Sequence, residues 1–210
     1  MKARSNVVYF LVAGLALSTL VGCSSMPATR TGFLSDGRSL SYSDDGSIGR
    51  YRTASTVDPT RIQVAEVQWR ADPSFTAEER TELAAQLQLA LYQAAGKAGA
   101  KPEGRPVAIR AAITRVETVS PVANVVSTLV LFVPLDRGGA AVEIEALDAD
   151  TQRQLAALSY AHYAPLTEFG ARFERLAPAG IAFKRAAEEF VALLEGQSMG
   201  SQQAALPARR

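Results

Sequence analysis

The first 23 residues decide how much of this chain is left to fold. Lys2 and Arg4 make the start positive, residues 7–21 form an uncharged apolar run, and Gly22 places a small residue before Cys23. This order of charge, apolar run and small residue is typical of a secretory signal peptide. An uncleaved anchor is the alternative, but the dense apolar part is about fifteen residues, short of the roughly 20 that span a bilayer. Removal of residues 1–22 leaves 188 of the 210 residues, which suits one domain with tails.

The end of this leader indicates how it is processed. Leu20-Val21-Gly22-Cys23 resembles the lipobox of bacterial lipoproteins, in which diacylglycerol alkylates the cysteine thiol before the leader is cut and the new amino group is acylated. The resemblance implies cleavage between Gly22 and Cys23, lipidation of Cys23, and attachment to a membrane through the acyl chains. Ser24 follows, with no aspartate, as in lipoproteins sent to the outer membrane of Gram-negative bacteria. We expect a lipid-anchored outer-membrane protein that faces the periplasm.

Composition excludes several kinds of partner. The mature chain would carry 20 basic and 21 acidic side chains, so it lacks the positive surface that nucleic-acid binding needs. Cys23 is the only cysteine and His162 the only histidine. This rules out an internal disulfide and a zinc site of the usual Cys/His kind. The sequence contains no catalytic or cofactor motif, so we expect neither a cofactor nor a metal.

Composition also divides the mature chain. Residues 23–56 are rich in Ser, Gly, Asp and Thr and lack periodicity, which predicts a lipidated N-terminus followed by a tether. Aromatic side chains such as Phe33 and Tyr51 are unusual in a pure linker, so we expect part of it to dock on the domain. Residues 57–196 should form the periplasmic domain, and residues 197–210 a disordered tail.

Hydrophobic periodicity predicts an α+β fold. Strands are expected at residues 61–69 and 106–119, and a hairpin at 140–147 and 155–163. Thr76 and Glu79 form a capping box that should begin a helix with one apolar stripe. A short helix is expected around 167–176, then an interruption at residues 178–180, then a helix over 181–194. We predict a two-layer sandwich, in which two main helices pack on a mostly antiparallel sheet of about four strands.

These elements resemble a known family of small lipoproteins from Gram-negative bacteria, a domain of unknown function. Gly32-Phe33-Leu34-Ser35-Asp36, with Leu40 after it, is similar to the family's GFLxDYxxL opening. The run from Gly138 to Asp148 resembles its second signature, GGAxVExExxD. Gly37 departs from the pattern, where tyrosine is usual, and Gln152 stands where the turn usually has glycine. The resemblance implies an envelope lipoprotein without an established activity, and Gln152 implies an altered turn, because a non-glycine residue at positive φ is strained.

Two groups of residues are candidates for chemistry. Glu143 and Glu145 project from one strand face and could be a paired-carboxylate hydrolase site or a cation site. We favour the solvated face of a half-buried strand, with Arg110 as a cross-strand partner. His162 could act as a base for Ser159, but the sequence has no G-x-S-x-G elbow, and we expect an exposed polar histidine. We therefore assign no catalytic residue.

One apolar segment leaves two interpretations open. Residues 122–134 carry no charge and many β-branched side chains, so they either enter the core or form an apolar surface for a protein partner or for lipid. We favour burial, because soluble domains rarely expose so much contiguous apolar area. If the segment is exposed instead, Val122, Val126 and Leu131 mark the candidate interaction surface.

Two functions from different classes fit the sequence. The first is a non-catalytic periplasmic binding or adaptor protein, anchored to the membrane and able to meet an envelope protein partner. The alternative is an envelope hydrolase that acts on cell wall or lipid through Glu143, Glu145 or His162. A pocket that encloses one of these side chains would favour the hydrolase, and flat placement on an open sheet would favour the adaptor.

Changing Cys23→Ala should abolish fatty-acid labelling and leave an unprocessed precursor, because no other residue can accept the diacylglyceryl group. Metabolic labelling with palmitate and the mass of the mature protein measure both effects. Globomycin, which blocks the dedicated signal peptidase, should make the wild-type precursor accumulate. Labelling that persists in the alanine variant would overturn the assignment.

Overall fold

The computed structural model describes residues 25–54, 57–97, 104–120, 122, 129, 137–165, 168 and 174–196. The predicted leader with Gly22 and Cys23, the tail at 197–210, Val126 and Leu131, and most of the helix expected around 167–176 lie outside these residues. Among the residues described, no helix is long and apolar enough to cross a membrane.

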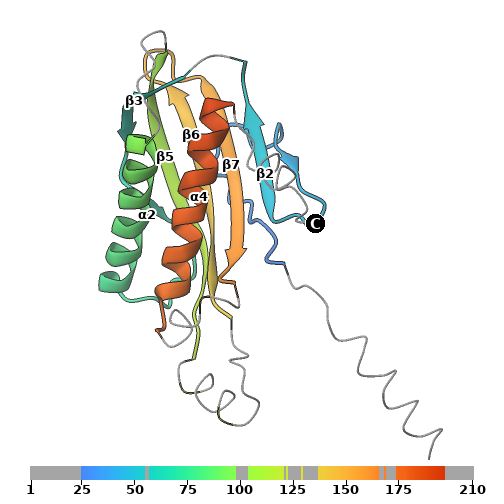
Figure 1. Cartoon of the computed structure of the whole chain (residues 1–210), viewed down its shortest axis with the longest axis vertical. Helices are drawn as coiled ribbons and strands as arrows, with labels where there is room; N and C mark the ends of the chain where they lie inside the picture. The colour runs from blue at the N-terminus through green and yellow to red at the C-terminus, as the bar shows by residue number, and fades with distance from the viewer. Residues whose placement is uncertain are drawn as a thin grey trace, which may run out of the picture.

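Within the described residues, two helices and seven strands form an α+β unit (Figure 1). The elements in chain order are β1 (Ser41–Tyr42), β2 (Ile48–Arg52), β3 (Val57–Val64), β4 (Gln68–Trp69), α2 (Ala77–Lys97), β5 (Arg105–Glu117), β6 (Gly139–Asp148), β7 (Gln154–Tyr163) and α4 (Ala177–Glu195). The sheet has the order β1-β2-β7-β6-β5-β3, and β4 also pairs with β5. The α+β class is confirmed.

The sheet is larger than predicted, and it is mixed. β3 and β4 run parallel to β5, whereas the other pairs are antiparallel. The prediction of about four mostly antiparallel strands was therefore wrong in two respects. First, α2 acts as a crossover helix that returns the chain to the end of the sheet from which β3 started, and such a connection makes parallel neighbours. Second, β1 and β2 come from the stretch that was predicted to be a tether, and β2 pairs with β7 over five residues.

The predicted start of α2 is confirmed, whereas the predicted start of α4 was misplaced. The capping box before α2 is confirmed, because the Thr76 amide donates to Glu79 Oε2 at 3.0 Å and the Glu79 amide to Thr76 Oγ1 at 3.2 Å. α4 starts at Ala177 rather than residue 181, so Pro178 lies in its first turn instead of interrupting it. The first amides of a helix have no intrahelical acceptor, and a proline there costs no hydrogen bond. Gly196 ends α4 with a φ of 78°.

The main core lies between the two helices and one face of the sheet (Figure 1). α2 contributes Leu83, Leu87 and Leu91, which are fully buried along one stripe. α4 contributes Phe183 and Phe190, which are also fully buried. The sheet meets them with alternate residues of its long strands, in the order expected for one face. These are Val107, Ile109, Ala111 and Ile113 of β5, and Ala140, Val142, Ile144 and Ala146 of β6.

The β6–β7 hairpin is confirmed, and its turn lies at the turn-forming residues 148–151. Asp148 Oδ1 accepts the amides of Asp150 at 3.1 Å and Thr151 at 2.9 Å, and the bond from Thr151 contributes most to lowering the pKa of Asp148 to about 2. Gln152 has a φ of 57°, a left-handed conformation that is strained for a residue with a side chain. Its side chain donates to the carbonyl of Ala149 at 3.0 Å.

Replacing Leu87 by alanine should lower the free energy of unfolding by about 2–5 kcal/mol, because it leaves a cavity in the packed stripe of α2. The matched control is Glu82→Ala on the exposed side of the same helix, which should stay within about 0.5 kcal/mol of wild type. Urea denaturation measures both. Similar losses in the two variants would mean that the inner face of α2 is wrongly assigned.

Candidate functional site

The face of the sheet opposite the helices is covered by residues 25–40, which we call the strap. Its apolar side chains Met26, Phe33, Leu34 and Leu40 are buried. They pack in two small clusters on the sheet, separate from the main core. The folded unit therefore includes residues 25–54, well before the residue 57 assigned from the sequence, and these residues do not form a free tether.

The sheet can accept the strap because the side chains beneath it are small. Ala112 and Ala157 lie under Phe33, Leu34 and Leu40. Nearer the start of the strap, Met26 packs on small side chains from β6 and β7, namely Ala141 and Ala161. Large side chains at these positions would hold the strap away from the sheet and leave its backbone without partners.

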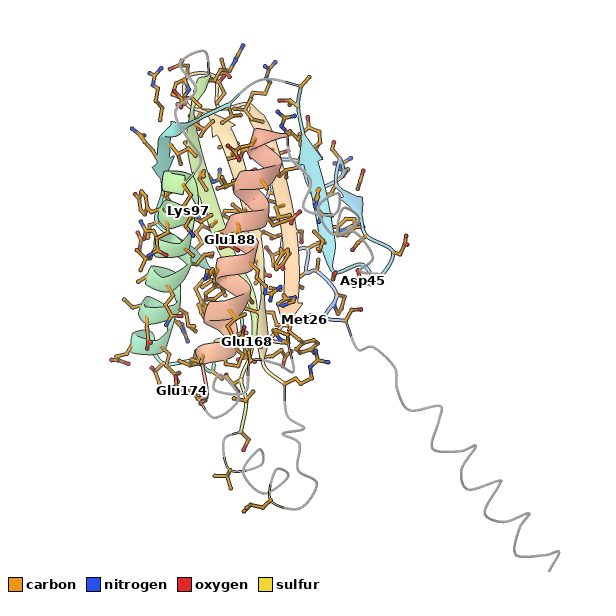
Figure 2. All side chains as sticks on the ribbon, in the orientation of Figure 1. Met26, Asp45, Lys97, Glu168, Glu174 and Glu188 are labelled. Atoms are coloured by element: carbon orange, nitrogen blue, oxygen red, sulfur yellow. The ribbon has the colours of Figure 1, made fainter. Side chains whose placement is uncertain are left out.

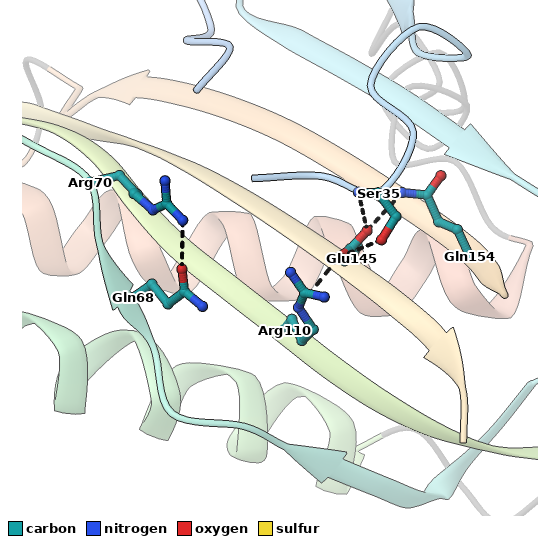
Figure 3. Close-up of polar contacts among 6 residues, drawn as sticks. All are labelled: Ser35, Gln68, Arg70, Arg110, Glu145 and Gln154. Carbon is teal, nitrogen blue, oxygen red and sulfur yellow. Dashed lines mark hydrogen bonds and ion pairs between the residues drawn. The ribbon is translucent and has the colours of Figure 1, made fainter. Parts of the chain in front are cut away.

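Glu145 is the main polar attachment of the strap (Figure 3). Its side chain is 0 % exposed. Ser35 donates its amide to Oε2 at 2.8 Å and its hydroxyl to Oε1 at 3.1 Å. Gln154 Nε2 donates to Oε2 at 2.8 Å, and Arg110 Nε lies 3.5 Å from Oε1. A carboxylate can be buried at acceptable cost when it has this many donors and a positive partner.

Glu143 makes a second attachment, two residues earlier on β6. It is 2 % exposed. Its two carboxylate oxygens share the amide of Thr31 at 3.4 and 3.3 Å, and the Thr31 hydroxyl donates to Oε2. Ser159 on β7 adds a hydrogen bond to the carbonyl of Thr29 at 3.2 Å. Polar groups on two neighbouring strands thus hold successive residues of the strap.

The prediction that Glu143 and Glu145 lie on a solvated strand face was therefore wrong. The predicted pair between Arg110 and Glu145 is confirmed. Arg110 and Glu145 are direct cross-strand partners in the β5–β6 register, as the sequence indicated. The two glutamates, however, lie beneath the strap and bond to it. A carboxylate pair of a hydrolase must reach substrate and water. In this arrangement the carboxylates instead fix a segment of their own chain.

His162 is separated from the serine that could have used it. The alternation of β7 places Ser159 and His162 on opposite faces of the sheet, and Ser159 faces the strap. Burial lowers the pKa of His162 to about 4, and the charges of Arg185 and Arg137 add to the effect, so the ring is neutral at neutral pH. Its Nε2 atom is buried without a hydrogen-bond partner. The expected exposed histidine is half-buried.

The described residues form several hollows, and two of them lie beside residues already discussed. A small cavity of about 130 Å³ lies at the end of β7, and a wider open groove of about 670 Å³ runs between α2 and β4. The first is lined by Ser25, Met26, Asp45, Ser47, Arg137, Ala161, His162 and Tyr163. The second is lined by Glu66, Val67, Gln68, Trp69, Arg80, Thr81, Ala84, Ala85 and Gln88. Within the part of the chain that the structure describes, no cluster of three or more His, Cys, Asp or Glu side chains could hold a metal ion.

Of the candidate interaction surface the structure describes only Val122, because Val126 and Leu131 lie outside the described residues. Val122 is 74 % exposed, and Leu129 of the same segment is 75 % exposed. Most of residues 122–134 lies outside the described residues, so the choice between core and contact surface stays a prediction. The sequence offered no signal to decide between them, because an apolar run has the same composition in a core and in a contact surface.

Changing Glu145→Ala should lower the free energy of unfolding by about 3 kcal/mol, because it leaves the Ser35 amide, the Gln154 amide and Arg110 without their acceptor. Glu66→Ala, an exposed glutamate at the groove beside α2, should change it by less than about 0.5 kcal/mol. Chemical denaturation of the two variants gives the comparison. Equal effects would show that Glu145 does not hold the strap.

Comparison with known proteins places the chain in a family. No curated protein matches it. Among solved structures, a PelC variant dodecamer from Paraburkholderia phytofirmans is 8 % identical, covers 72 % of this chain and 97 % of its own, and has a TM-score of 0.42. A second PelC dodecamer from that organism is 9 % identical, with 73 % and 99 % covered and a TM-score of 0.39.

The hypothetical protein CT253 from Chlamydia trachomatis is 15 % identical, with 70 % of this chain and 99 % of its own covered and a TM-score of 0.32. Similarities at this level carry no argument about function. The family model of a protein of unknown function, DUF3313, matches residues 32–190, from the strap into α4. The chain therefore belongs to the DUF3313 family.

Proposed function

We propose that this protein is a lipoprotein of the outer membrane, anchored through acyl chains on Cys23, and that its domain is a non-catalytic periplasmic binding or adaptor module. The observation that carries the proposal is the strap. Because the strap is bonded to the sheet from Thr29 onward and packed on it from Met26, the folded unit starts within three residues of the proposed lipid. Such an arrangement supports a module held beside the bilayer, since a flexible tether of the length expected from the sequence would allow excursions of roughly 30 Å.

The contacts of Glu143 and Glu145 and the lowered pKa of His162 support a binding role over the alternative, an envelope hydrolase acting on cell wall or lipid. Glu143 and Glu145 are engaged by Thr31 and Ser35 of the strap. His162 has a pKa of about 4, which makes it a weak general base at neutral pH. A hydrolase would need an accessible carboxylate pair or a histidine beside a nucleophile, and Glu143, Glu145 and His162 supply neither arrangement.

Chemical crosslinking in living cells, followed by affinity purification of the lipidated protein, tests the adaptor role. We expect a discrete adduct with one envelope protein. The adduct should disappear in the Cys23→Ala variant, because the unanchored domain no longer stays beside its partner.

The hydrolase is tested with the purified lipidated protein on peptidoglycan and on phospholipid vesicles. The adaptor proposal predicts no release of muropeptides or fatty acids. Release that is lost in a His162→Gln variant, or in a variant with Glu143→Gln and Glu145→Gln together, would contradict it.

A further inference from the structure

The outer side of α2 carries large apolar side chains and lacks charge over most of its length. Residues 83–96 contain no charged side chain. Leu89 and Tyr92, one helical turn apart, are 56 % and 49 % exposed, and Ala85, one turn earlier, is also exposed. A helix side that meets only water normally carries charged residues. An uncharged side with an exposed leucine and tyrosine is typical of a surface that meets a partner.

These side chains belong to one stripe that points away from the core. At about 100° per residue, five exposed residues of α2 fall within a sector of roughly 60°. They are Glu78, Ala85, Leu89, Tyr92 and Gly96. The buried leucines of α2 lie on the opposite side of the helix. Among the described elements α2 contacts α4, β3 and β4, which lie beside or beneath it, and Figure 1 shows α2 at the margin of the molecule.

The two halves of the stripe differ in shape. In the first half, Thr81, Ala84 and Ala85 line the groove of about 670 Å³ between α2 and β4. In the second half, Leu89 and Tyr92 project from the helix. One half of α2 thus offers a hollow lined by small side chains, and the other half offers two large side chains of a size to fill it. A surface with this pattern is complementary to a second copy of itself.

A two-fold axis at the middle of α2 brings the unlike halves together. The midpoint of the helix is residue 87. When two copies pack with their helices antiparallel around this point, Leu89 of one copy lies opposite Ala85 of the other. Tyr92 then lies opposite Thr81, at the groove. Each contact occurs twice, as in any interface with two-fold symmetry, and the small side chains let the helix axes approach to about 8–10 Å.

The charges at the ends of α2 favour the same arrangement. Its first turn contains Glu78 and Glu79, and its last turn contains Lys97, so antiparallel copies place Lys97 at the level of Glu78 at both ends of the interface. Figure 2 shows Lys97 beside Glu188 of α4. Their charged atoms are 4.0 Å apart and the Lys97 side chain is 70 % exposed, which leaves it accessible to a second copy. Antiparallel helix dipoles also attract one another, whereas parallel copies would bring like charges together.

We propose that a second copy of this chain binds the outer side of α2, and that the two α2 helices pack antiparallel around a two-fold axis near residue 87. Leu89 and Tyr92 of each copy fill the groove lined by Thr81 and Ala85 of the other. The dimer presents two copies of the domain to an envelope partner, which goes beyond the proposed adaptor role. It requires neither the lipid anchor nor the absence of catalysis, so it can fail while the proposed function stands.

Sedimentation of the full lipidated chain in density-matched detergent tests the association. At tens of micromolar, the wild type should have the mass of two chains. Leu89→Glu should have the mass of one, because it brings two carboxylates together at the centre of an apolar interface. Leu89 is exposed in the single chain, so this variant should fold normally, which circular dichroism checks. The matched control Lys184→Glu, on the exposed side of α4, should remain a dimer.

A wild-type mass of one chain would overturn the proposal. So would a dimer that persists in Leu89→Glu, because the charged side chains would then lie outside the interface. Equal loss of the dimer in Lys184→Glu would have the same consequence, since the effect would come from added negative charge and not from its place on α2.

Disulfide formation tests the position of the axis and the direction of the helices. Gln88→Cys adds a thiol close to the axis, and mild oxidation should join two chains there. Thr81→Cys should not join, because antiparallel copies hold its two thiols roughly 18 Å apart along the helix, too far for a disulfide. Cys23 is the only native cysteine, and oxidised wild type shows any linkage through it. Equal linkage at positions 81 and 88, or none at 88, would contradict the antiparallel dimer.

A photoreactive amino acid in place of Leu89 identifies the partner in cells. Two co-expressed copies with different tags should be joined in one adduct of twice the mass. An adduct with a different envelope protein alone would overturn the second copy as the partner and would leave the adaptor proposal intact.

Discussion

The carboxylate of Glu145 holds the two sides of this structure together. It is fully buried, and its oxygens accept hydrogen bonds from Ser35 of the strap and from Gln154 of β7, while Arg110 of β5 lies beside it. A buried carboxylate without such donors would be strongly destabilising. The fold is therefore stable only when Ser35, Gln154 and Arg110 are in place around Glu145. The strap therefore belongs to the fold, because removing it would expose a charged and hydrogen-bonding row in the middle of an otherwise apolar sheet.

This constraint explains why the sheet is covered on both faces by different means. On one side two helices bring large side chains such as Phe183 and Phe190 into a thick core. On the other side alanines on β5, β6 and β7 leave only enough room for an extended chain, and the polar groups of that chain are satisfied by Glu143, Glu145 and Ser159. Side-chain size thus selects a packed helical layer on one face and a single strap on the other. For function, the strap keeps the proposed lipid anchor on Cys23 close to the domain, because Met26, three residues later, packs on the sheet.

Local signals in the sequence predicted the local structure well. The capping box of Thr76 and Glu79 and the β6–β7 hairpin follow from short-range chemistry, and the Arg110–Glu145 pair follows from the pairing of two successive long strands. The errors came from long-range contacts. Alternating Glu143 and Glu145 have the pattern of a wet strand face, and only a segment about 110 residues earlier in the chain buries them. That segment has no periodicity, so its aromatic residues were the only hint of docking. The parallel pairing of β3 with β5 could likewise not be predicted, because the composition of a strand does not determine which strand it pairs with.

Hydrogen–deuterium exchange in the strap of the wild-type lipidated protein tests the central claim most directly. If the strap is part of the fold, the amides of Thr31 and Ser35, which donate to Glu143 and Glu145, should be protected to an extent comparable with the amides of β6, because they open only when the sheet opens. The exposed amide of Arg38, at the turn that follows, provides an internal reference for weaker protection. Exchange of Thr31 and Ser35 at the rate of an unstructured chain would show that residues 25–40 are a free tether and would contradict the account.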